Sequence, residues 1–242
     1  MVEITILDWI NGLLSLITVI IVSIIGLVMI AKYKKYKVKT LIFMGFAQIF
    51  IISPWQGSSG EFLYLIITGN LLPSAVYIFL ICYLAPLAGL SITAGFTEMK
   101  FRNKQKLLVG IFIILGIIME TYIIYFLIVD ANVLGRRFGP FDFEYSGFMR
   151  YYIIFLIVYV TLIGLFMGIT GLNSDNPEIR WKGRFLILAF ISWSLAAIAD
   201  AVIETNLATV FFVRILLISS AIEMYCGFIL PDWLKHKLIK TK

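Results

Sequence analysis

Long apolar runs separated by short polar connections recur along the whole chain of 242 residues. A helix needs about twenty mostly apolar residues to cross a bilayer. Seven runs meet this length and predict spans at 10–30, 40–56, 71–95, 107–129, 149–171, 185–203 and 207–230. We therefore expect an all-α integral membrane protein, with residues 1–242 forming a single seven-transmembrane helix bundle.

One apolar stretch, from Gly60 to Gly95, is too long for a single straight span. Pro73 and Pro86 lie inside it, and each removes a backbone donor and favours a kink. We expect the crossing to run over 71–95. Residues 61–70 are then expected to lie at the outer interface or to re-enter the membrane.

Composition agrees with a lipid environment. Hydrophobic residues make up 61% of the chain and charged residues 14%, whereas soluble domains have roughly 45–50% and about 25%. Such an excess leaves too little polar surface for a fold surrounded by water. The longest polar interruption, 130–148, is too short to fold alone and is predicted to be an outer loop.

Basic residues alternate between the loops and predict the orientation. Sixteen belong to one set of connections and three to the other, so the positive-inside rule places the N-terminus outside and the C-terminus in the cytoplasm. The sixteen are Lys32, Lys34, Lys35, Lys37, Lys39, Lys100, Arg102, Lys104, Lys106, Arg180, Lys182, Arg184, Lys235, Lys237, Lys240 and Lys242, and the three are Arg136, Arg137 and Arg150. The formal charge of +6 therefore favours contact with the headgroups of the lipid bilayer, not nucleic acid. We expect residues 231–242 to form the basic cytoplasmic tail.

The outer loop contains a pattern typical of a short hairpin. Aromatic residues at 141, 143 and 145 alternate with Asp142 and Glu144, and a Gly-Pro pair at 139–140 marks a turn. We expect Arg136 and Arg137 to meet these acids across the turn. An interfacial belt of aromatic side chains explains the same residues equally well.

Charged residues inside the spans are the best candidates for a function, since each costs about 2.5–3.5 kcal/mol at mid-membrane. Asp200 and Glu204 are four residues apart on one predicted helical face, and Trp193 lies seven residues before Asp200. Arg214, on the next helix, lies at a similar depth. We predict an Asp200–Arg214 ion pair in a pocket lined also by Trp193 and Glu204. Ligand binding and a purely structural clamp both remain open.

Two further acidic residues, Glu120 and Glu223, are candidates for a proton path or a polar pocket. Glu223 is about half a turn out of phase with Arg214, so the two cannot share a face. Small residues surround it at helical spacing. The alternative is that both carboxyls are neutral and only join helices.

Small residues also recur at helical spacing in two other spans, a pattern that lets helices approach closely in lipid. We interpret them as packing residues. They are Thr161, Gly164 and Gly168 in the fifth span, and Asn11, Ser15, Thr18 and Val22 in the first.

The sequence lacks the residues that several kinds of chemistry require. No lysine lies in a predicted span, which excludes a retinal Schiff base, and His236 is the only histidine. Cys82 and Cys226 lie in apolar segments and are interpreted as packing residues. No phosphate-binding glycine loop or protease motif is present. We expect no catalytic residues, no cofactor and no metal site, and hence no enzyme.

Two short segments carry a resemblance. The first is Gly227-Phe-Ile-Leu-Pro-Asp-Trp-Leu-Lys235, and the second is Asn176-Pro-Glu-Ile-Arg-Trp-Lys-Gly-Arg184. The first resembles the exit of the last helix in the N-terminal seven-transmembrane sensor regions of prokaryotic histidine kinases. The second resembles the basic loop before helix six in the same regions. Helix count, loop lengths and orientation are similar over the whole chain. The resemblance implies a sensor that moves its last helix to signal inward. No kinase or other output domain follows the tail in this sequence. Either the sensor works through a separate cytoplasmic signalling partner, or the signalling role is gone, or the resemblance is only a shared seven-helix layout.

The leading hypothesis is therefore a sensor or receptor-like protein that reads a small or membrane-derived signal. One alternative is a small proton-coupled transporter or channel that uses Glu120 and Glu223. Another is a non-catalytic membrane scaffold. The sequence predicts neither the ligand nor the oligomeric state.

Overall fold

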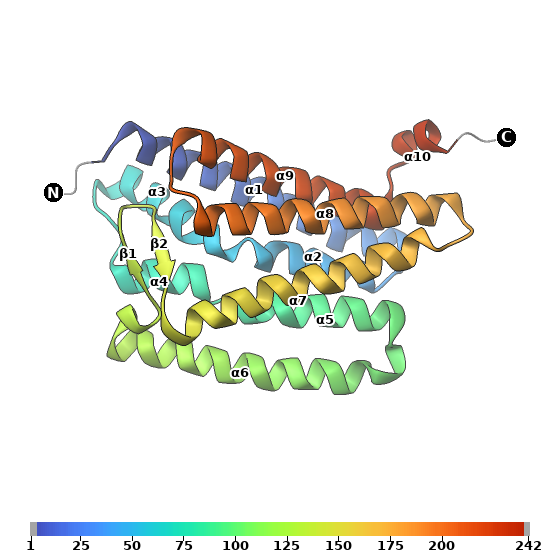
Figure 1. Ribbon diagram of the computed structural model, residues 1–242, viewed down its shortest axis with the longest axis horizontal. Coiled ribbons are helices and arrows are strands. Elements are labelled where there is room, and N and C mark those ends of the chain that lie inside the picture. The colour runs from blue at the N-terminus through green and yellow to red at the C-terminus, as the bar shows by residue number, and fades with distance from the viewer. Residues whose placement is uncertain (1–3, 240–242) are drawn as a thin grey trace.

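The computed structural model describes residues 4–239 as a bundle of helices with one small β-hairpin (Figure 1). Within this range, seven helices are long and apolar enough to cross a membrane, which confirms the predicted number and supports a multi-pass membrane protein. Five spans contain one main helix each: α1 (Ile6–Tyr36), α6 (Gln105–Val129, after the short helix η2 at Arg102–Lys104), α7 (Gly147–Leu172), α8 (Pro177–Val202) and α9 (Leu207–Ile229).

Polar residues at the connections define where these helices begin. The Thr5 hydroxyl accepts a hydrogen bond from the backbone nitrogen of Asp8 (3.2 Å), and the Asp8 carboxylate accepts one from the backbone nitrogen of Thr5 (2.8 Å), which is a capping box. Asn176 caps α8 and Asn206 caps α9 through their side-chain oxygens. Each cap satisfies backbone donors that the first helical turn leaves free.

The second span differs from the prediction. Helix α2 (Thr40–Ile51) continues through a short helix, η1 (Ser53–Trp55), into α3 (Gln56–Thr68). The helical segment therefore continues past the predicted end at 56, and residues 61–68 belong to it. The polar run Gly57-Ser-Ser-Gly-Glu61 interrupts the apolar pattern, but Glu61 is fully buried in the bundle.

The third span is broken where the prolines predicted a kink. It consists of α4 (Ser74–Cys82) and α5 (Ala85–Lys100), separated by a turn at residues 83–84. Pro73 precedes α4, and Pro86 lies in the first turn of α5, where its missing N–H is not needed.

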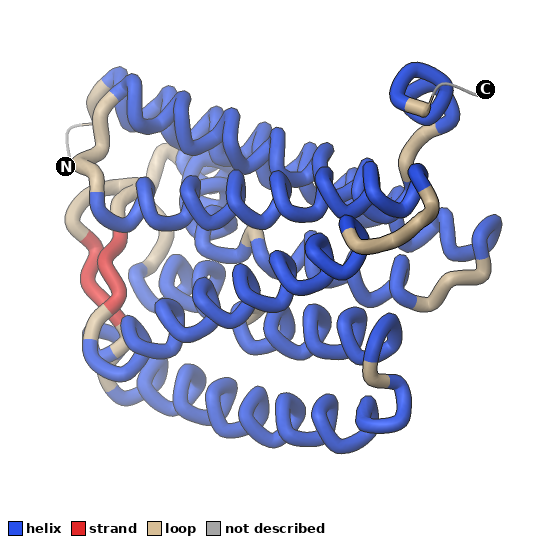
Figure 2. The backbone as a smooth tube through the Cα atoms, turned by 45° about the vertical axis from the view of Figure 1, so that its right-hand side comes forward, coloured by secondary structure: helices blue, strands red, loops and turns tan. Residues whose placement is uncertain are grey.

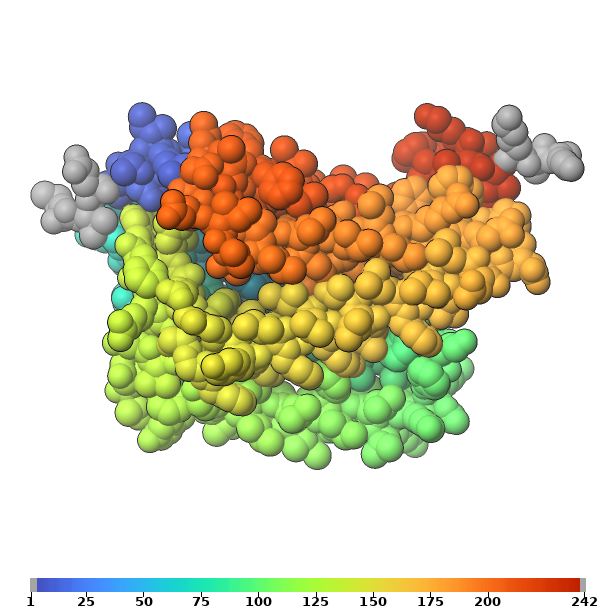
Figure 3. All heavy atoms as spheres, viewed as in Figure 1, coloured from blue at the N-terminus to red at the C-terminus, as the bar shows by residue number. Residues whose placement is uncertain are grey.

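The predicted hairpin is confirmed. After the short helix η3 (Ala131–Val133), strands β1 (Gly135–Arg137) and β2 (Phe143–Tyr145) pair antiparallel, with Arg136 opposite Glu144. Figure 2 shows the two strands crossing one end of the helical bundle. In Figure 3, the yellow-green hairpin segment covers that end beside the orange segment of α8 and α9.

The two ends of the bundle differ in character (Figure 1). The end that carries the hairpin, called here the hairpin end, holds the connections at 69–73, 130–146 and 203–206. The opposite end, called the basic end, holds the connections at 37–39, 101–104 and 173–176, together with the short helix α10 (Asp232–Leu238). Helix α8 packs between α7 and α9, and α9 also packs on α1, whereas α6 lies at the other edge against α4 and α5.

Helices α7 and α8 approach each other backbone to backbone. A Cβ atom on Gly183 would lie 2.6 Å from the carbonyl oxygen of Gly168 and 2.7 Å from the backbone nitrogen of Leu172. Further along the contact, the hydroxyls of Thr161 and Ser194 share a hydrogen bond of 2.6 Å. The small residues predicted as a packing seam in the fifth span therefore form this contact.

Gly183→Ala is expected to lower the thermal midpoint of unfolding in detergent micelles, because the added methyl group meets backbone atoms that cannot move independently of the helix. Gly110→Ala on α6 is the matched control, since a Cβ there has no heavy atom within 4 Å. Alanine in place of a helical glycine is worth roughly 0.5–1 kcal/mol, so the control is expected to be neutral or stabilising. Equal midpoints for the two variants would contradict this packing.

Candidate functional site

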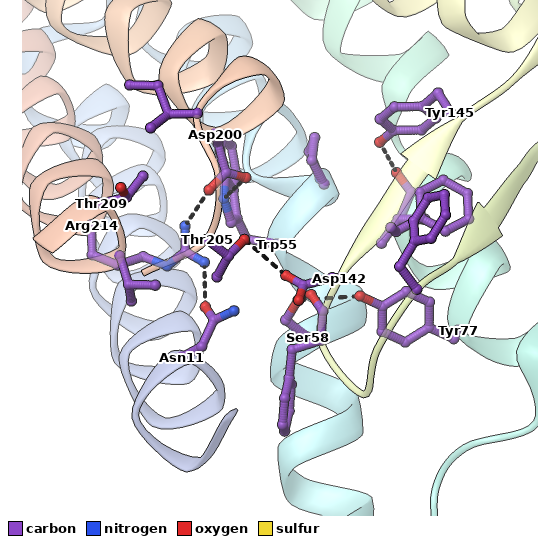
Figure 4. A pocket seen from close by; sticks show the side chains of 17 residues that line it. Asn11, Trp55, Ser58, Tyr77, Asp142, Tyr145, Asp200, Thr205, Thr209 and Arg214 are labelled. Carbon is purple, nitrogen blue, oxygen red and sulfur yellow. Dashed lines mark hydrogen bonds and ion pairs between the residues drawn. The ribbon is translucent and has the colours of Figure 1, made fainter. Parts of the chain in front are cut away.

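A cavity of about 160 Å³ lies at the hairpin end, where several elements meet (Figure 4). Residues of α1, η1, α3, α4, the hairpin, α8 and α9 line it, so segments from both halves of the sequence form its wall. The cavity is partly open. Its lining combines carboxylates, hydroxyls and a guanidinium with aromatic rings.

An ion pair between neighbouring helices forms one wall of the cavity. Arg214 Nη1 on α9 lies 3.3 Å from Asp200 Oδ1 on α8, which confirms the predicted contact. Arg214 also donates from Nη2 to Asn11 Oδ1 (2.8 Å) and to Ser15 Oγ (3.0 Å), both on α1. The other oxygen of Asp200 accepts a hydrogen bond from Trp55 Nε1 at 3.0 Å. Four elements are thus joined through one charged pair.

The two partners differ in exposure, which gives them different roles. Arg214 is only 4% exposed, so its charge depends on the partners that the fold supplies. The side chain of Asp200 is 40% exposed and remains accessible from the cavity. Arg214 therefore holds the helices together, while Asp200 combines that contact with a surface that a ligand can reach.

The other two residues predicted for this pocket lie elsewhere. Trp193 belongs to the apolar core and does not line the cavity, and its indole nitrogen is buried without a hydrogen-bond partner among the described residues. Glu204 is exposed and also lies outside the cavity lining. Helix α8 ends at Val202, so the four-residue spacing from Asp200 to Glu204 no longer places them on one helical face.

The hairpin supplies a second carboxylate to the cavity. Asp142, in the turn between the strands, accepts a hydrogen bond from the Thr205 hydroxyl at 3.1 Å. Burial raises the pKa of Asp142, and the nearby carboxylates of Asp8 and Asp200 raise it further, against the opposing effects of the Thr205 hydrogen bond and of Arg214. Ser58 on α3 donates to the carbonyl oxygen of Phe141 (3.1 Å) and so fixes the turn on the bundle.

A second ion pair anchors the hairpin. Arg137 Nη2 lies 2.6 Å from Glu61 Oε2, and the Arg137 guanidinium lies 4.2 Å from the centre of the Tyr77 ring. The other Glu61 oxygen accepts a hydrogen bond from the backbone nitrogen of Leu72 at 3.1 Å. The guanidinium also donates to the carbonyl oxygens of residues 72 and 140.

This pair corrects the expected hairpin contacts. Arg137 does not form an ion pair with Asp142 or Glu144, because the buried Glu61 on α3 takes its charge. Glu144 forms its ion pair with Arg150 at the start of α7 instead. Arg136 stands opposite Glu144 in the strand register without an ion pair to it.

The structure separates Glu120 from Glu223. Glu120 is on α6 and Glu223 is on α9, and these helices occupy opposite edges of the bundle (Figure 1). Glu223 Oε1 accepts a hydrogen bond from Ser219 at 2.6 Å, while its Oε2 is buried without a partner among the described residues. The two acids therefore do not form one path or one pocket.

Several residues of the site are not predicted from the sequence. The sequence pattern predicts a packing role for Asn11 and Ser15, and Trp55 and Ser58 lie near the predicted end of the second span. A useful signal was available in the first span, where Asn11 and Ser15 are polar and four residues apart on a helix with few other polar residues. Such a pair indicates a buried partner for hydrogen bonds.

Comparisons with protein-family models, with curated proteins and with solved structures found no match.

Asp200→Asn is expected to destabilise the protein by about 3 kcal/mol, the lower end of the range for removing one partner of a buried pair, because Asp200 is partly exposed. The cost arises from the buried Arg214 charge that loses its counter-ion. Asp200→Asn combined with Arg214→Met is therefore expected to be more stable than Asp200→Asn alone. The free energy of unfolding in mixed micelles measures this. A double variant that is less stable than the single variant would show that Arg214 does not need Asp200.

Proposed function

We propose that this chain is a seven-helix membrane sensor whose cavity at the hairpin end receives a small ligand and whose basic end passes the change to a cytoplasmic partner. The supporting observation is the Asp200–Arg214 pair, which lies in the cavity wall and joins α8 to α9. A ligand in this cavity lies beside that pair and so changes the surroundings of the contact between these two helices. Only a ligand with different affinities for two arrangements can shift the balance between them.

The same two helices lead to the basic end. Helix α9 runs without interruption from Leu207 to Ile229, and α10 follows after a short turn at residues 230–231. Glu178, in the first turn of α8, forms ion pairs with Lys182 and with Lys235 of α10. Glu178 raises the pKa of Lys235 above its usual range, so this lysine stays charged at neutral pH. α8 therefore has ion pairs to α9 at one end and to α10 at the other.

The distribution of basic residues supports an orientation for this proposal. Among residues 4–239, fourteen lysines and arginines lie in or beside the connections and the short helix of the basic end, and three lie in or beside the connections of the hairpin end. We infer from this bias that the hairpin end faces the exterior and that α10 lies at the cytoplasmic face. The ligand would then enter from outside and the signal would leave through α10.

The separation of Glu120 and Glu223 favours a sensor over a carrier. A proton-coupled carrier needs polar groups that connect both faces, and these two acids lie on helices at opposite edges. The polar groups of the cavity are instead concentrated at one end of the bundle.

A cavity-filling variant tests the proposed transmission without knowledge of the ligand. Thr209 lines the cavity on the first turn of α9, so Thr209→Trp is expected to displace α9 and change the distance between spin labels at positions 104 and 237 on the basic end. Phe212→Trp is the matched control, because Phe212 is 52% exposed on the same helix and lies outside the cavity lining. Double electron–electron resonance in nanodiscs measures the distances. An unchanged distance in a folded Thr209→Trp variant, or the same change in the control, would contradict the proposed function.

A further inference from the structure

The charges around the cavity do not balance. Asp142, Asp200 and Arg214 are the ionisable acids and bases that line it, apart from tyrosine hydroxyls. Asp200 and Arg214 form an ion pair, so their charges balance, although the buried Nε of Arg214 has no hydrogen-bond partner among the described residues. Asp142 has the Thr205 hydroxyl as a donor, but within residues 4–239 no lysine or arginine nitrogen lies within 4.0 Å of its carboxylate. When both acids are ionised, the cavity carries one negative charge without a counter-ion.

The two arginines near the cavity already form ion pairs or hydrogen bonds with other groups. Arg137, the basic residue at the end of β1 in the same hairpin, pairs with Glu61 and with backbone carbonyls. Arg214 directs its Nη atoms to Asp200, Asn11 and Ser15. The fold therefore holds Asp142 in a half-buried position that a ligand can complete, since burying an unpaired charge is unfavourable.

The rest of the wall suits a cation. Aromatic rings present a negative face that attracts cations, most strongly where water is excluded. One ring of this cavity already does so, because the Arg137 guanidinium lies over Tyr77 at 4.2 Å. Six aromatic residues line the cavity: Trp55, Tyr77, Phe138, Phe141, Phe143 and Tyr145.

We infer that the cavity binds the ammonium group of a small organic cation, with the Asp142 carboxylate as its counter-ion and the aromatic rings as its wall. The inference rests on the proposed function, since it names the ligand class for the same cavity. A volume of about 160 Å³ is close to that of a protein cavity that accommodates benzene, so a substituted ammonium of similar size fits. The group belongs either to a free amine or to a lipid headgroup that reaches the open side.

Other ligand classes fit less well. Ca²⁺ takes six to eight oxygen ligands, and the described residues contain no group of three or more acidic, histidine or cysteine side chains that could hold a metal ion. An anion would have to displace Asp200 from Arg214, and it would meet the charge of Asp142. A cation meets a free carboxylate without breaking an existing pair.

Choline is a direct probe, because its charge does not titrate. Calorimetry in phospholipid-free micelles is expected to show binding of choline, and binding at least about tenfold weaker for its neutral isostere with a quaternary carbon in place of the nitrogen. Asp142→Asn is expected to weaken choline binding by about tenfold or more, a difference of roughly 1.4 kcal/mol. Glu144→Gln is the matched control in the same hairpin, since Glu144 pairs with Arg150 and lies outside the cavity lining.

Equal binding of choline and its neutral isostere would overturn the inference. So would unchanged affinity in Asp142→Asn, or an equal loss in Glu144→Gln. If choline and ethanolamine both fail to bind while Thr209→Trp still moves α10, the inference fails and the proposed function stands. If choline binds but Thr209→Trp does not move α10, the inference stands and the proposed function fails.

The pH dependence supplies a second measurement on the unaltered protein. The protonated Asp142 carboxyl is neutral, so choline affinity is expected to rise with pH through the raised pKa of this group. The groups that face Asp142 are Asp8 on α1, Tyr77 on α4, Thr205, Asp200 on α8 and Arg214 on α9. Thr205→Val removes a donor that lowers the pKa, so the midpoint is expected to move to higher pH. A flat profile, or an unchanged midpoint in Thr205→Val, would contradict the role of Asp142 even if Asp142→Asn does not fold.

Two nanodisc compositions distinguish the sources of the ammonium. If lipid headgroups occupy the cavity, free choline binds more weakly in discs that contain phosphatidylcholine than in discs of phosphatidylglycerol alone. Equal affinity in the two compositions assigns the cavity to a free cation. Both results support an ammonium site, whereas absence of choline binding in micelles and in phosphatidylglycerol discs overturns it.

Discussion

A buried guanidinium is the constraint around which the hairpin end is arranged. Arg214 is 4% exposed, and removing an arginine from water is costly unless a counter-ion and acceptors replace the water. Asp200 supplies the charge, and Asn11 and Ser15 supply acceptors from the first helix. The contact therefore joins segments about two hundred residues apart in sequence, and the helices α1, α8 and α9 must meet at this point for both Nη atoms of Arg214 to have partners.

The hairpin is also held by a buried charge that needs a counter-ion, with different partners. Glu61 is fully buried, and Arg137 reaches it from β1 while donating to backbone carbonyls around the turn. This second pair holds the hairpin over the bundle and leaves Asp142 at the edge of the cavity. Two ion pairs thus position one carboxylate, that of Asp142, which forms no ion pair among the described residues. The carboxylate of Asp142 without a cation, and not the cavity alone, makes the site favour a positively charged ligand.

The periodic and compositional signals predicted much of this architecture. Seven apolar runs indicated seven spans, the prolines at 73 and 86 indicated a broken third span, and alternation over 141–145 indicated the hairpin. These features depend on neighbouring residues, so the local pattern is sufficient. The Asp200–Arg214 pair was also predictable, because a short connection fixes the relative depth of two adjacent helices.

The remaining features depend on contacts between distant segments. The polar run after Gly57 resembles the end of a span, and only Arg137, 76 residues further on, makes it possible to bury Glu61 within a helix. The assignment of Glu204 failed because α8 ends at Val202, which the residue spacing does not reveal. Trp193 shares a face with Asp200, but it lies in the core, beyond the reach of the cavity. One-dimensional spacing predicts which residues share a helix face and not which neighbour that face meets.

The proposed function depends on a bilayer around the seven helices with the hairpin end outside. Single cysteines replacing Glu204 and Lys104 test this directly, since both positions are exposed at opposite ends of the bundle, while Cys82 and Cys226 are buried. A membrane-impermeant maleimide applied to intact cells is expected to label Glu204→Cys, and to label Lys104→Cys only after lysis. Labelling of Lys104→Cys in intact cells, with Glu204→Cys protected until lysis, would contradict the proposed orientation and the external entry of the ligand.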